Sequence, residues 1–288
     1  MKILLATDGS SCSEEAARFL AQLDFGPDDQ ILVLHVLSEI PYDDDYHAKI
    51  KRLIRTAAPK IIQSTMGVLS SSHASISSMA VEGYPDTAII ETALEEDVHL
   101  VVMGARGVRG IKLLVLGSST RSVAINSPRH TMVIKQPLPP SGVKKILFAF
   151  DGSDCSFATG NLLTQIPFPG EPEVTVLHVT QSPLSDIPAH FLSPDERSIL
   201  EDAPLEISEL QELFDNAWGL LGRRFGKIKT AVLSGSPAMQ ILTAIKASRP
   251  DLVAVGSRGL RGVKGMLGSV SRNVLAFAQA SVIIGKVC

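Results

Sequence analysis

The residues with the clearest chemical potential are glycines and hydroxyl residues that follow a short apolar segment. Residues 104–107 read Gly-Ala-Arg-Gly, and nine residues later the sequence continues Gly117-Ser118-Ser119-Thr120. Glycines let backbone N–H groups approach an oxyanion, and the free N–H groups and hydroxyls at the start of a helix can hold phosphate. The pattern therefore predicts a phosphate site, with the alternative that these glycines only form tight strand-to-helix turns.

Other known chemical motifs are missing from these segments. Neither a Gly-Lys-Ser/Thr loop nor a Gly-x-Gly-x-x-Gly sequence occurs at the first predicted turn, and no arrangement of nucleophile and base is evident. We therefore predict no catalytic residue and no metal ligand. Asp8 and Asp151 each precede a glycine at the end of a predicted strand. Their carboxylates could contact a ligand, and the alternative is that they accept hydrogen bonds within their own turns. We expect His35 and His178 to be core or interface residues, and Cys12 and Cys155 to be ordinary turn residues.

The chain repeats itself. The segment Lys2–Ser10 recurs as Lys145–Ser153, and the segment Val102–Lys112 recurs as Ala254–Lys264. Because these matches keep the same order along the chain, they indicate two copies of one domain. We predict a first domain over 1–137, a Pro/Gly-rich linker over 138–143 and a second domain over 144–288.

The pattern within each copy predicts alternating strands and helices. In the first copy we expect strands near 3–7, 30–37, 75–81, 100–103 and 131–134, with helices near 13–23, 46–71, 85–97 and 117–126. In the second copy we expect strands near 145–150, 174–179, 228–233, 252–255 and 281–285, and a helix near 208–223. Continuous apolar strands that alternate with helices predict an α/β fold with a parallel sheet covered on both faces. Such sheets bind ligands at the carboxyl ends of their strands, where the strand order reverses.

Composition narrows the class of protein. The 288 residues are 45% hydrophobic and 20% charged, with a net charge of -3 and 5% aromatic residues. A weakly acidic chain lacks the basic surface that nucleic acids or anionic membranes attract, so neither is an expected partner. Asp8 interrupts the first apolar run too early for a signal peptide, and no apolar run is long enough to span a membrane, so we expect a cytoplasmic protein.

The combined motifs resemble the universal stress protein family. Asp8 ends the first strand, His35-Val36 lies on the second, Gly83-x-Pro85 precedes the third helix, and the two glycine segments follow. The resemblance covers nearly the whole chain twice, as in tandem members of the family. It implies two Rossmann-like domains of the adenine nucleotide alpha hydrolase-like type, each a five-stranded parallel sheet flanked by helices. It also implies pairing of the two last strands across an internal pseudo-two-fold axis.

The resemblance implies a cofactor, ATP or a related adenine nucleotide, and leaves open whether Mg²⁺ accompanies it. In the first copy the implied contact residues are Ala6, Thr7, Asp8, Val36, Met103, Gly104, Gly107, Gly117, Ser118, Ser119 and Thr120. In the second copy they are Ala149, Phe150, Asp151, Val179, Val255, Gly256, Gly259, Gly268, Ser269, Val270 and Ser271.

The second copy departs from the pattern. Eight residues, instead of nine, separate Gly259 from Gly268. One residue spans up to about 3.5 Å of chain, which exceeds the tolerance of a hydrogen bond. Phe150 replaces Thr7, and we expect its bulk to crowd the adenosine. The first site is therefore the stronger prediction.

Three functional hypotheses follow. The first is a tandem universal stress protein that binds ATP, at least in its first domain, and acts as a nucleotide-dependent stress-response or regulatory protein. The second is an enzyme with at most weak ATP hydrolysis. The third is a structural pseudo-dimer that binds no nucleotide. Association of two chains into a homodimer is left open.

Overall fold

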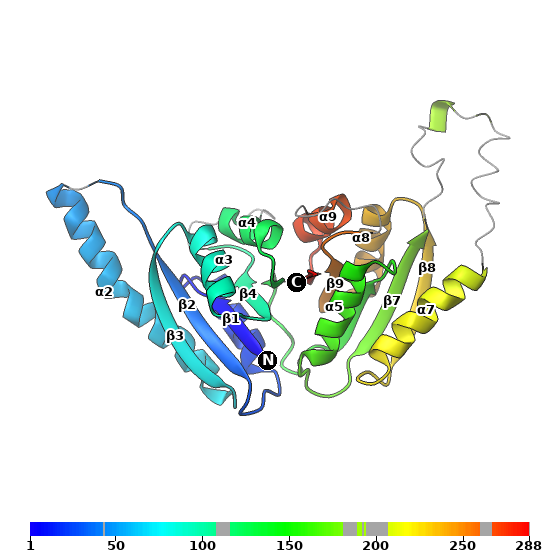
Figure 1. Cartoon of the computed structure of the whole chain (residues 1–288), viewed down its shortest axis with the longest axis horizontal. Helices are drawn as coiled ribbons and strands as arrows, with labels where there is room; N and C mark the ends of the chain where they lie inside the picture. Colours follow the sequence, from blue (N-terminus) through cyan, green and yellow to red (C-terminus); the bar gives the residue numbers. More distant parts are fainter. Residues whose placement is uncertain are drawn as a thin grey trace.

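A single ten-stranded sheet runs through the molecule (Figure 1). The computed structural model describes residues 1–42, 44–107, 116–180, 189–191, 193, 207–259 and 267–287. The strand order is β3-β2-β1-β4-β5-β10-β9-β6-β7-β8, so the two copies of the repeat occupy the two halves of the sheet.

The elements of the first copy follow the predicted alternation. They are β1 (Lys2–Ala6), α1 (Ser11–Ala21), β2 (Gln30–Ser38), α2 (Asp45–Val68), the 3₁₀ turn η1 (Leu69–Ser71), β3 (Ser75–Gly83), α3 (Pro85–Glu95), β4 (Leu100–Gly104), α4 (Ser118–Asn126) and β5 (His130–Ile134).

The second copy repeats this plan. Its elements are β6 (Lys145–Ala149), α5 (Asp154–Gln165), β7 (Glu173–Thr180), the 3₁₀ turn η3 (Ala189–Phe191), α7 (Ile207–Leu221), β8 (Ile228–Ser234), α8 (Pro237–Ser248), β9 (Leu252–Gly256), α9 (Ser269–Phe277) and β10 (Ser281–Gly285). Residues 181–188, 192 and 194–206, between β7 and α7, lie outside the described residues.

Local sequence signals explain where the helices begin. The hydroxyl of Ser10 accepts a hydrogen bond from the Ser13 N–H at 3.2 Å and caps α1. Ser153 caps α5 in the same way through the Ser156 N–H at 3.3 Å. These serine caps satisfy N–H groups that a helix start leaves without an intrahelical partner. Pro85 opens α3, where its missing N–H is not needed.

Each half of the sheet is parallel, and its strand order reverses once. In the first half β1 pairs with β2 on one side and with β4 on the other. In the second half β6 pairs with β7 and β9 in the same manner. The carboxyl ends of β1 and β4, and of β6 and β9, are therefore the points where an open α/β sheet offers a ligand crevice.

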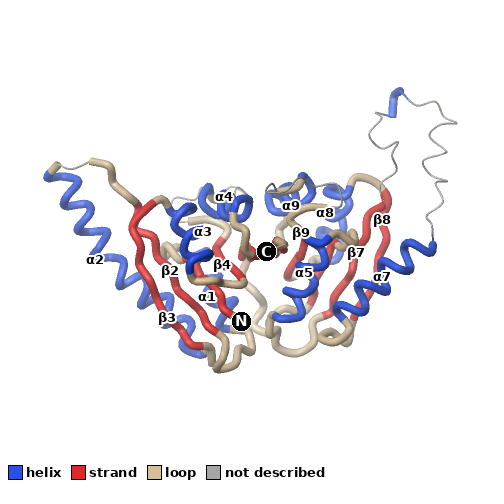
Figure 2. The backbone as a smooth tube through the Cα atoms, in the orientation of Figure 1, coloured by secondary structure: helices blue, strands red, loops and turns tan. Residues whose placement is uncertain are grey.

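Helices cover both faces of the sheet (Figure 2). In the first half α1 and α2 pack together on one face, and α3 and α4 pack together on the other. In the second half the corresponding pairs are α5 with α7 and α8 with α9. Both faces of the central strands are covered, and for this reason β4 reads as an unbroken apolar run instead of an alternating one.

The two halves meet where β5 and β10 pair in antiparallel fashion. Met132 lies opposite Ile283, and these residues occupy equivalent positions of the two copies. A pseudo-two-fold axis therefore passes through this pair, as expected from the resemblance. Both residues belong to one buried cluster that extends into α1 and α5, so the copies share a core as well as a sheet.

Two lysines connect the halves beside this strand pair. The Lys135 ammonium donates to the carbonyl oxygens of Leu275 and Ala278, at the end of α9, at 2.6 and 2.7 Å. Its counterpart Lys286 donates to the Ile125 carbonyl, at the end of α4, at 2.9 Å. Burial lowers the pKa of each lysine to about 8. A lysine follows the last apolar strand in both copies, which is a signal for this pair in the sequence.

Among the described residues no helix is both long enough and apolar enough to cross a membrane.

Candidate functional site

The carboxyl ends of β1 and β4 bring the predicted first-copy segments together. β1 ends at Ala6 and leads to Asp8, while β4 ends at Gly104 and leads to Gly107. The two strands are neighbours, with Ala6 in register with Met103. In the second copy Ala149 is in register with Val255, so Asp151 and Gly256 follow neighbouring strands as well.

The two strand-end aspartates each accept a hydrogen bond from the turn that follows them. An Asp8 carboxylate oxygen, Oδ1, accepts the Ser10 N–H at 3.0 Å, and the Asp151 carboxylate accepts the Ser153 N–H at 3.1 Å. The turn role that the sequence left open is thus present in both copies. The other oxygen of each carboxylate, Oδ2, lies so close to Gly107 or Gly259 that a Cβ at either glycine would collide with it. Each aspartate therefore sits directly beside a glycine segment.

The second glycine segment begins helix α4. The Gly117 N–H donates to the Ala105 carbonyl at 2.9 Å, and the Thr120 hydroxyl donates to the Gly104 carbonyl at 2.9 Å. These bonds fix the start of α4 beside the end of β4. Gly117 is the N-cap residue, and as a glycine it has no side chain to cap this helix. The first-turn N–H groups, at the positive end of the helix dipole, are therefore available to an anion.

Gly104 and Gly117 differ in how much space surrounds them for a side chain. A Cβ on Gly104 would lie 2.5 Å from the backbone carbonyl carbon of Cys12, so close packing against α1 requires glycine there. A Cβ on Gly117 would meet the Ala105 oxygen at 3.5 Å, an ordinary contact, and its φ of -61° suits any residue. The described part of the fold therefore explains Gly104 but gives no such reason for Gly117.

The second copy builds the same corner with small differences. The Gly268 N–H donates to the Ser257 carbonyl at 2.8 Å, and this residue also starts its helix without a side-chain cap. The Ser271 hydroxyl donates to the Ser257 carbonyl at 2.9 Å, whereas its counterpart Thr120 reaches Gly104, one position earlier. The shortened loop between the glycine segments falls largely on 260–266, outside the described residues.

The remaining predicted residues form the floor and one wall of each site. Ala6 and Met103 are buried, and Val36 packs against their cluster on the face covered by α3 and α4. Ala149, Val179 and Val255 occupy the matching cluster under α8 and α9. Ser118, Ser119, Ser269 and Val270 lie in the first turns of α4 and α9.

Two predicted contact residues turn their side chains away from this wall. The Thr7 hydroxyl lies 3.0 Å from the Thr65 hydroxyl of α2, on the opposite face of the sheet. Phe150 is 1% exposed and packs edge-on against Phe157, with ring centroids 5.1 Å apart. The expectation that the bulk of Phe150 crowds the second site is therefore wrong. Phe150 and Phe148 are two residues apart and share a face, and their rings pack together in the core.

The two strand histidines are structural, as expected. The buried His35 donates from Nδ1 to the Thr7 carbonyl at 2.8 Å, and His178 donates from Nδ1 to the Phe150 carbonyl at 2.9 Å. Each imidazole thereby fastens the end of one strand to its neighbour. These hydrogen bonds engage the carbonyl oxygens of Thr7 and Phe150, the residues that directly precede the two aspartates.

Two cavities lie away from the glycine segments. One, of about 450 Å³, separates α2 from the sheet and is lined by Leu37, Arg55, Ile62 and Met66 among others. The other, of about 390 Å³, runs along α5 and is lined by His130, Asn161 and Gln165 among others. Residues 108–115 and 260–266, which flank the glycine segments, are outside the described residues, so the candidate site is defined here by its backbone and its floor.

Comparisons with known proteins agree with this architecture. The model of the universal stress protein family matches residues 1–135 and again residues 142–286. The universal stress protein YxiE of Bacillus subtilis is 30% identical over 150 residues, covering 49% of this chain and 97% of that protein. The universal stress protein Mb2028c of Mycobacterium bovis is 24% identical over 303 residues, covering 99% of this chain and 96% of that protein.

A solved structure shares the two-domain fold. A universal stress protein from Archaeoglobus fulgidus superimposes with a TM-score of 0.66 at 19% identity, covering 99% of this chain and 98% of that one. At that identity the likeness supports the fold alone, while the double match to the family model covers nearly all of the sequence. The chain belongs to the universal stress protein family, with two copies of the family's domain in tandem.

Proposed function

We propose that the first domain, residues 1–137, binds ATP or a related adenine nucleotide, with its phosphates at the start of α4. The observation that carries this proposal is Gly117. Among the described residues nothing in the packing or the backbone geometry demands glycine here, and Gly117 begins its helix without a side chain of its own to cap it, at the point where the strand order reverses. The absence of a side chain there leaves room for an oxyanion to approach the backbone N–H groups.

The residues described fit an adenine nucleotide in their general chemistry. The α4 N–H groups and the hydroxyls of Ser118 and Ser119 can donate to phosphate oxygens. Ala6, Val36 and Met103 offer an apolar wall suited to a planar base. Asp8, beside Gly107, offers carboxylate oxygens that can accept from a ribose hydroxyl.

The second domain, which we place at 144–288 after a linker over 138–143, supports binding less strongly. A Cβ on Gly268 would lie 3.3 Å from the Ser257 oxygen, so packing contributes more to this glycine than to Gly117. Its loop is also one residue shorter. With no catalytic residue assigned, we propose a regulatory role: bound nucleotide orders the glycine segments and changes the surface shown to a partner in a stress response.

The test measures nucleotide in the purified protein and ATP binding by titration calorimetry, with and without Mg²⁺. We expect one strong site per chain. Gly117→Ala should weaken ATP binding at least about tenfold, or about 1.4 kcal/mol, because the new methyl group intrudes on the phosphates. Because glycine is a better N-cap residue than alanine, the unfolding midpoint of this variant should fall only slightly. Gly67→Ala is the matched control, since a Cβ at Gly67 meets nothing within 4 Å.

The outcomes separate the three hypotheses. If the wild-type protein carries no nucleotide and binds none, the hypothesis of a structural pseudo-dimer is the one that remains. Steady release of ADP would indicate an ATPase. Equal losses of binding from Gly117→Ala and Gly268→Ala would contradict the ranking of the two sites.

A further inference from the structure

The first half of helix α2 projects beyond the sheet. Along α2 only Ala58 and Thr65 are buried, and both lie in its second half. Near its start Tyr46 and Leu53 are 68% and 65% exposed. In Figure 1 the blue start of α2 extends past the edge of β3 at the end of the molecule. This helix therefore carries a surface that its own domain does not cover.

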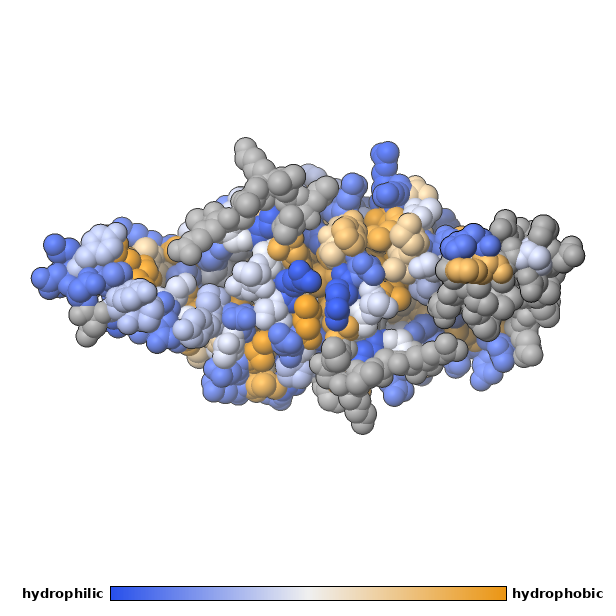
Figure 3. All heavy atoms as spheres, turned by 90° about the horizontal axis from the view of Figure 1, so that it is seen from above, coloured by the Kyte–Doolittle hydropathy of each residue, from blue (hydrophilic) through white to orange (hydrophobic). Residues whose placement is uncertain are grey.

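The exposed surface of α2 mixes apolar and basic side chains along one helix face. Tyr46, Leu53 and Ala57 recur at the spacing of one helix face, and all three are exposed. Lys49 and Lys60 lie on the same face, between and after these residues, while Arg52 lies beside it, and all three are exposed. Figure 3 shows apolar side chains among strongly hydrophilic ones at this end of the molecule. We call this surface, defined by Tyr46, Lys49, Arg52, Leu53 and Lys60, the α2 face.

The equivalent helix of the second domain, α7, has the opposite charge. Helix α2 contains five lysines and arginines and one aspartate, whereas α7 contains three acidic residues and no base. Glu209, Glu212 and Asp215 are all exposed, beside Trp218, which is 47% exposed. We call this surface the α7 face.

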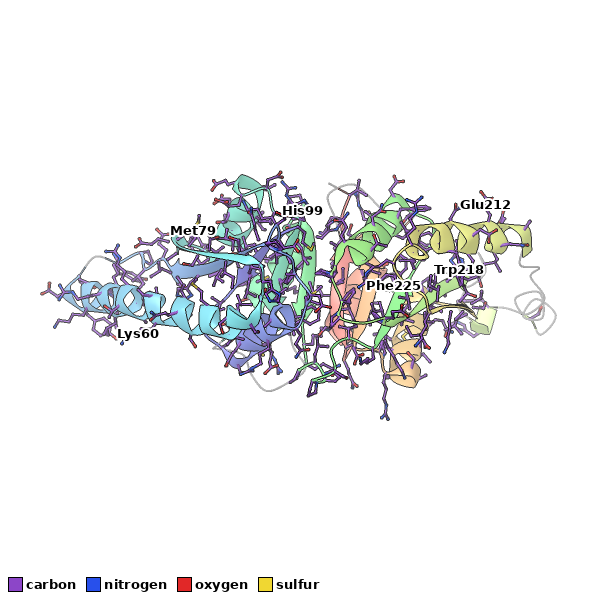
Figure 4. All side chains as sticks on the ribbon, turned by 90° about the horizontal axis from the view of Figure 1, so that it is seen from below. Lys60, Met79, His99, Glu212, Trp218 and Phe225 are labelled. Carbon is purple, nitrogen blue, oxygen red and sulfur yellow. The ribbon has the colours of Figure 1, made fainter. Side chains whose placement is uncertain are left out.

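The two faces lie at opposite ends of the molecule. Figure 4 shows Lys60 on α2 at one end and Glu212 and Trp218 on α7 at the other. Helix α2 packs over β2 and β3 at one edge of the sheet, and α7 packs over β8, the outer strand at the other edge. The α2 face therefore cannot reach the α7 face of its own chain.

We propose that the α2 face of one copy of this chain docks on the α7 face of a second copy. The basic residues of one surface meet the acidic residues of the other, and Leu53 and Tyr46 cover Trp218. Because every copy carries both complementary surfaces, the chain supplies its own partner at equal concentration. Opposite charges across such a contact favour encounter of these two surfaces, whereas two α2 faces would repel each other.

This contact joins two different surfaces, so it is heterologous. Such contacts continue from molecule to molecule unless the rotation between copies closes a ring. The average mass should therefore rise steadily with protein concentration instead of stopping at a dimer. Salt should oppose the association, because exposed charges are screened beyond about 8–10 Å at physiological ionic strength.

The experiment uses charge reversal in the full chain and sedimentation velocity at low salt. One variant, Lys49→Glu/Arg52→Glu, makes the α2 face acidic. The other, Glu212→Lys/Asp215→Lys, makes the α7 face basic. We expect each variant alone to associate at least about tenfold more weakly than wild type. An equimolar mixture should regain association, because each reversed face then finds an opposite charge on the other variant.

Controls keep the result interpretable. Lys227→Glu/Lys246→Glu changes the net charge as much as the first variant but at exposed residues outside the α2 and α7 faces, and it should associate like wild type. Far-UV circular dichroism should show that all variants are folded. A wild-type chain that stays monomeric at high concentration and low salt would overturn the proposal. So would a mixture that fails to regain association, or an effect of only one of the two variants.

Discussion

At the scale of single residues, the junction between the two domains lowers the pKa of His130. Its Nδ1 accepts the Lys286 N–H at 3.0 Å, at the end of the β5–β10 pair. Burial, reinforced by the charges of His99, Arg129 and Lys286, lowers the pKa of His130 to about 4 from an ordinary value near 6.5. The equivalent position of the other copy is Ser281, whose hydroxyl accepts the Lys135 N–H at 3.2 Å. One half of the junction can therefore be titrated at this position and the other cannot.

The pH dependence of stability follows from that difference in pKa. As the pH falls from about 6.5 to 4, His130 takes up a proton in the unfolded chain but resists it in the folded one. The free energy of unfolding therefore decreases over this range, by up to about 3 kcal/mol, and this contribution is complete above pH 6.5. His130→Asn keeps an acceptor for the Lys286 N–H but cannot titrate. Urea unfolding at pH 7 and pH 5 should show a smaller loss in the variant, and equal losses would contradict this account.

At the scale of elements, Lys135 and Lys286 bind the C-terminal ends of helices from the opposite domain. A cation suits the negative end of the helix dipole, yet burial opposes the charge and brings the pKa of each lysine to about 8. Between pH 8 and 10.5 the unfolded chain keeps these protons while the folded chain releases them. Stability should therefore rise with pH in this range, on the order of 2 kcal/mol for each lysine. Lys135→Met should remove part of that rise, measured as the difference from wild type in urea unfolding at pH 8 and 10.

Element positions were readable from the sequence because buried parallel strands are short, continuous apolar runs. The segments around β1, β4, β6 and β9 were predicted to within two residues of their observed ends. The long predicted helix over 46–71 is α2 followed by the 3₁₀ turn η1. The pairing of β5 with β10 came from the family resemblance, since nothing in a single strand reveals its partner across 150 residues.

The candidate site could be predicted from the sequence only in part, because one segment of sequence does not show which other segment packs against it. Glycine spacing located the corner between β4 and α4, but it could not separate Gly104, which packing explains, from Gly117, which packing does not. That distinction depends on how closely α1 approaches β4 in space. The direction of Phe150 was predictable from alternation, since it shares a face with the buried Phe148. The opposite charges of α2 and α7 were visible in the sequence, but their meaning required knowing that the two helices lie at opposite ends.

At the scale of the whole molecule, the continuous sheet should make the two domains unfold together. β5 and β10 exchange backbone hydrogen bonds, and buried clusters on both faces contain residues of both domains. The chain has one tryptophan, Trp218, in α7 of the second domain. Its fluorescence reports unfolding of that domain alone, whereas far-UV circular dichroism reports both, so coincident transitions indicate a single cooperative unit.

A substitution in the first domain makes this test decisive. Gly104→Ala places a Cβ 2.5 Å from the Cys12 carbonyl carbon, so α1 must shift, and we expect a loss of about 1–3 kcal/mol. Because the sheet and core are shared, the urea midpoint seen by Trp218 should fall together with the midpoint seen by circular dichroism. Gly67→Ala, in open space on α2, should lower neither midpoint. If the Trp218 midpoint stays in place while the circular dichroism transition splits in two, the domains fold independently and the β5–β10 junction couples them only weakly.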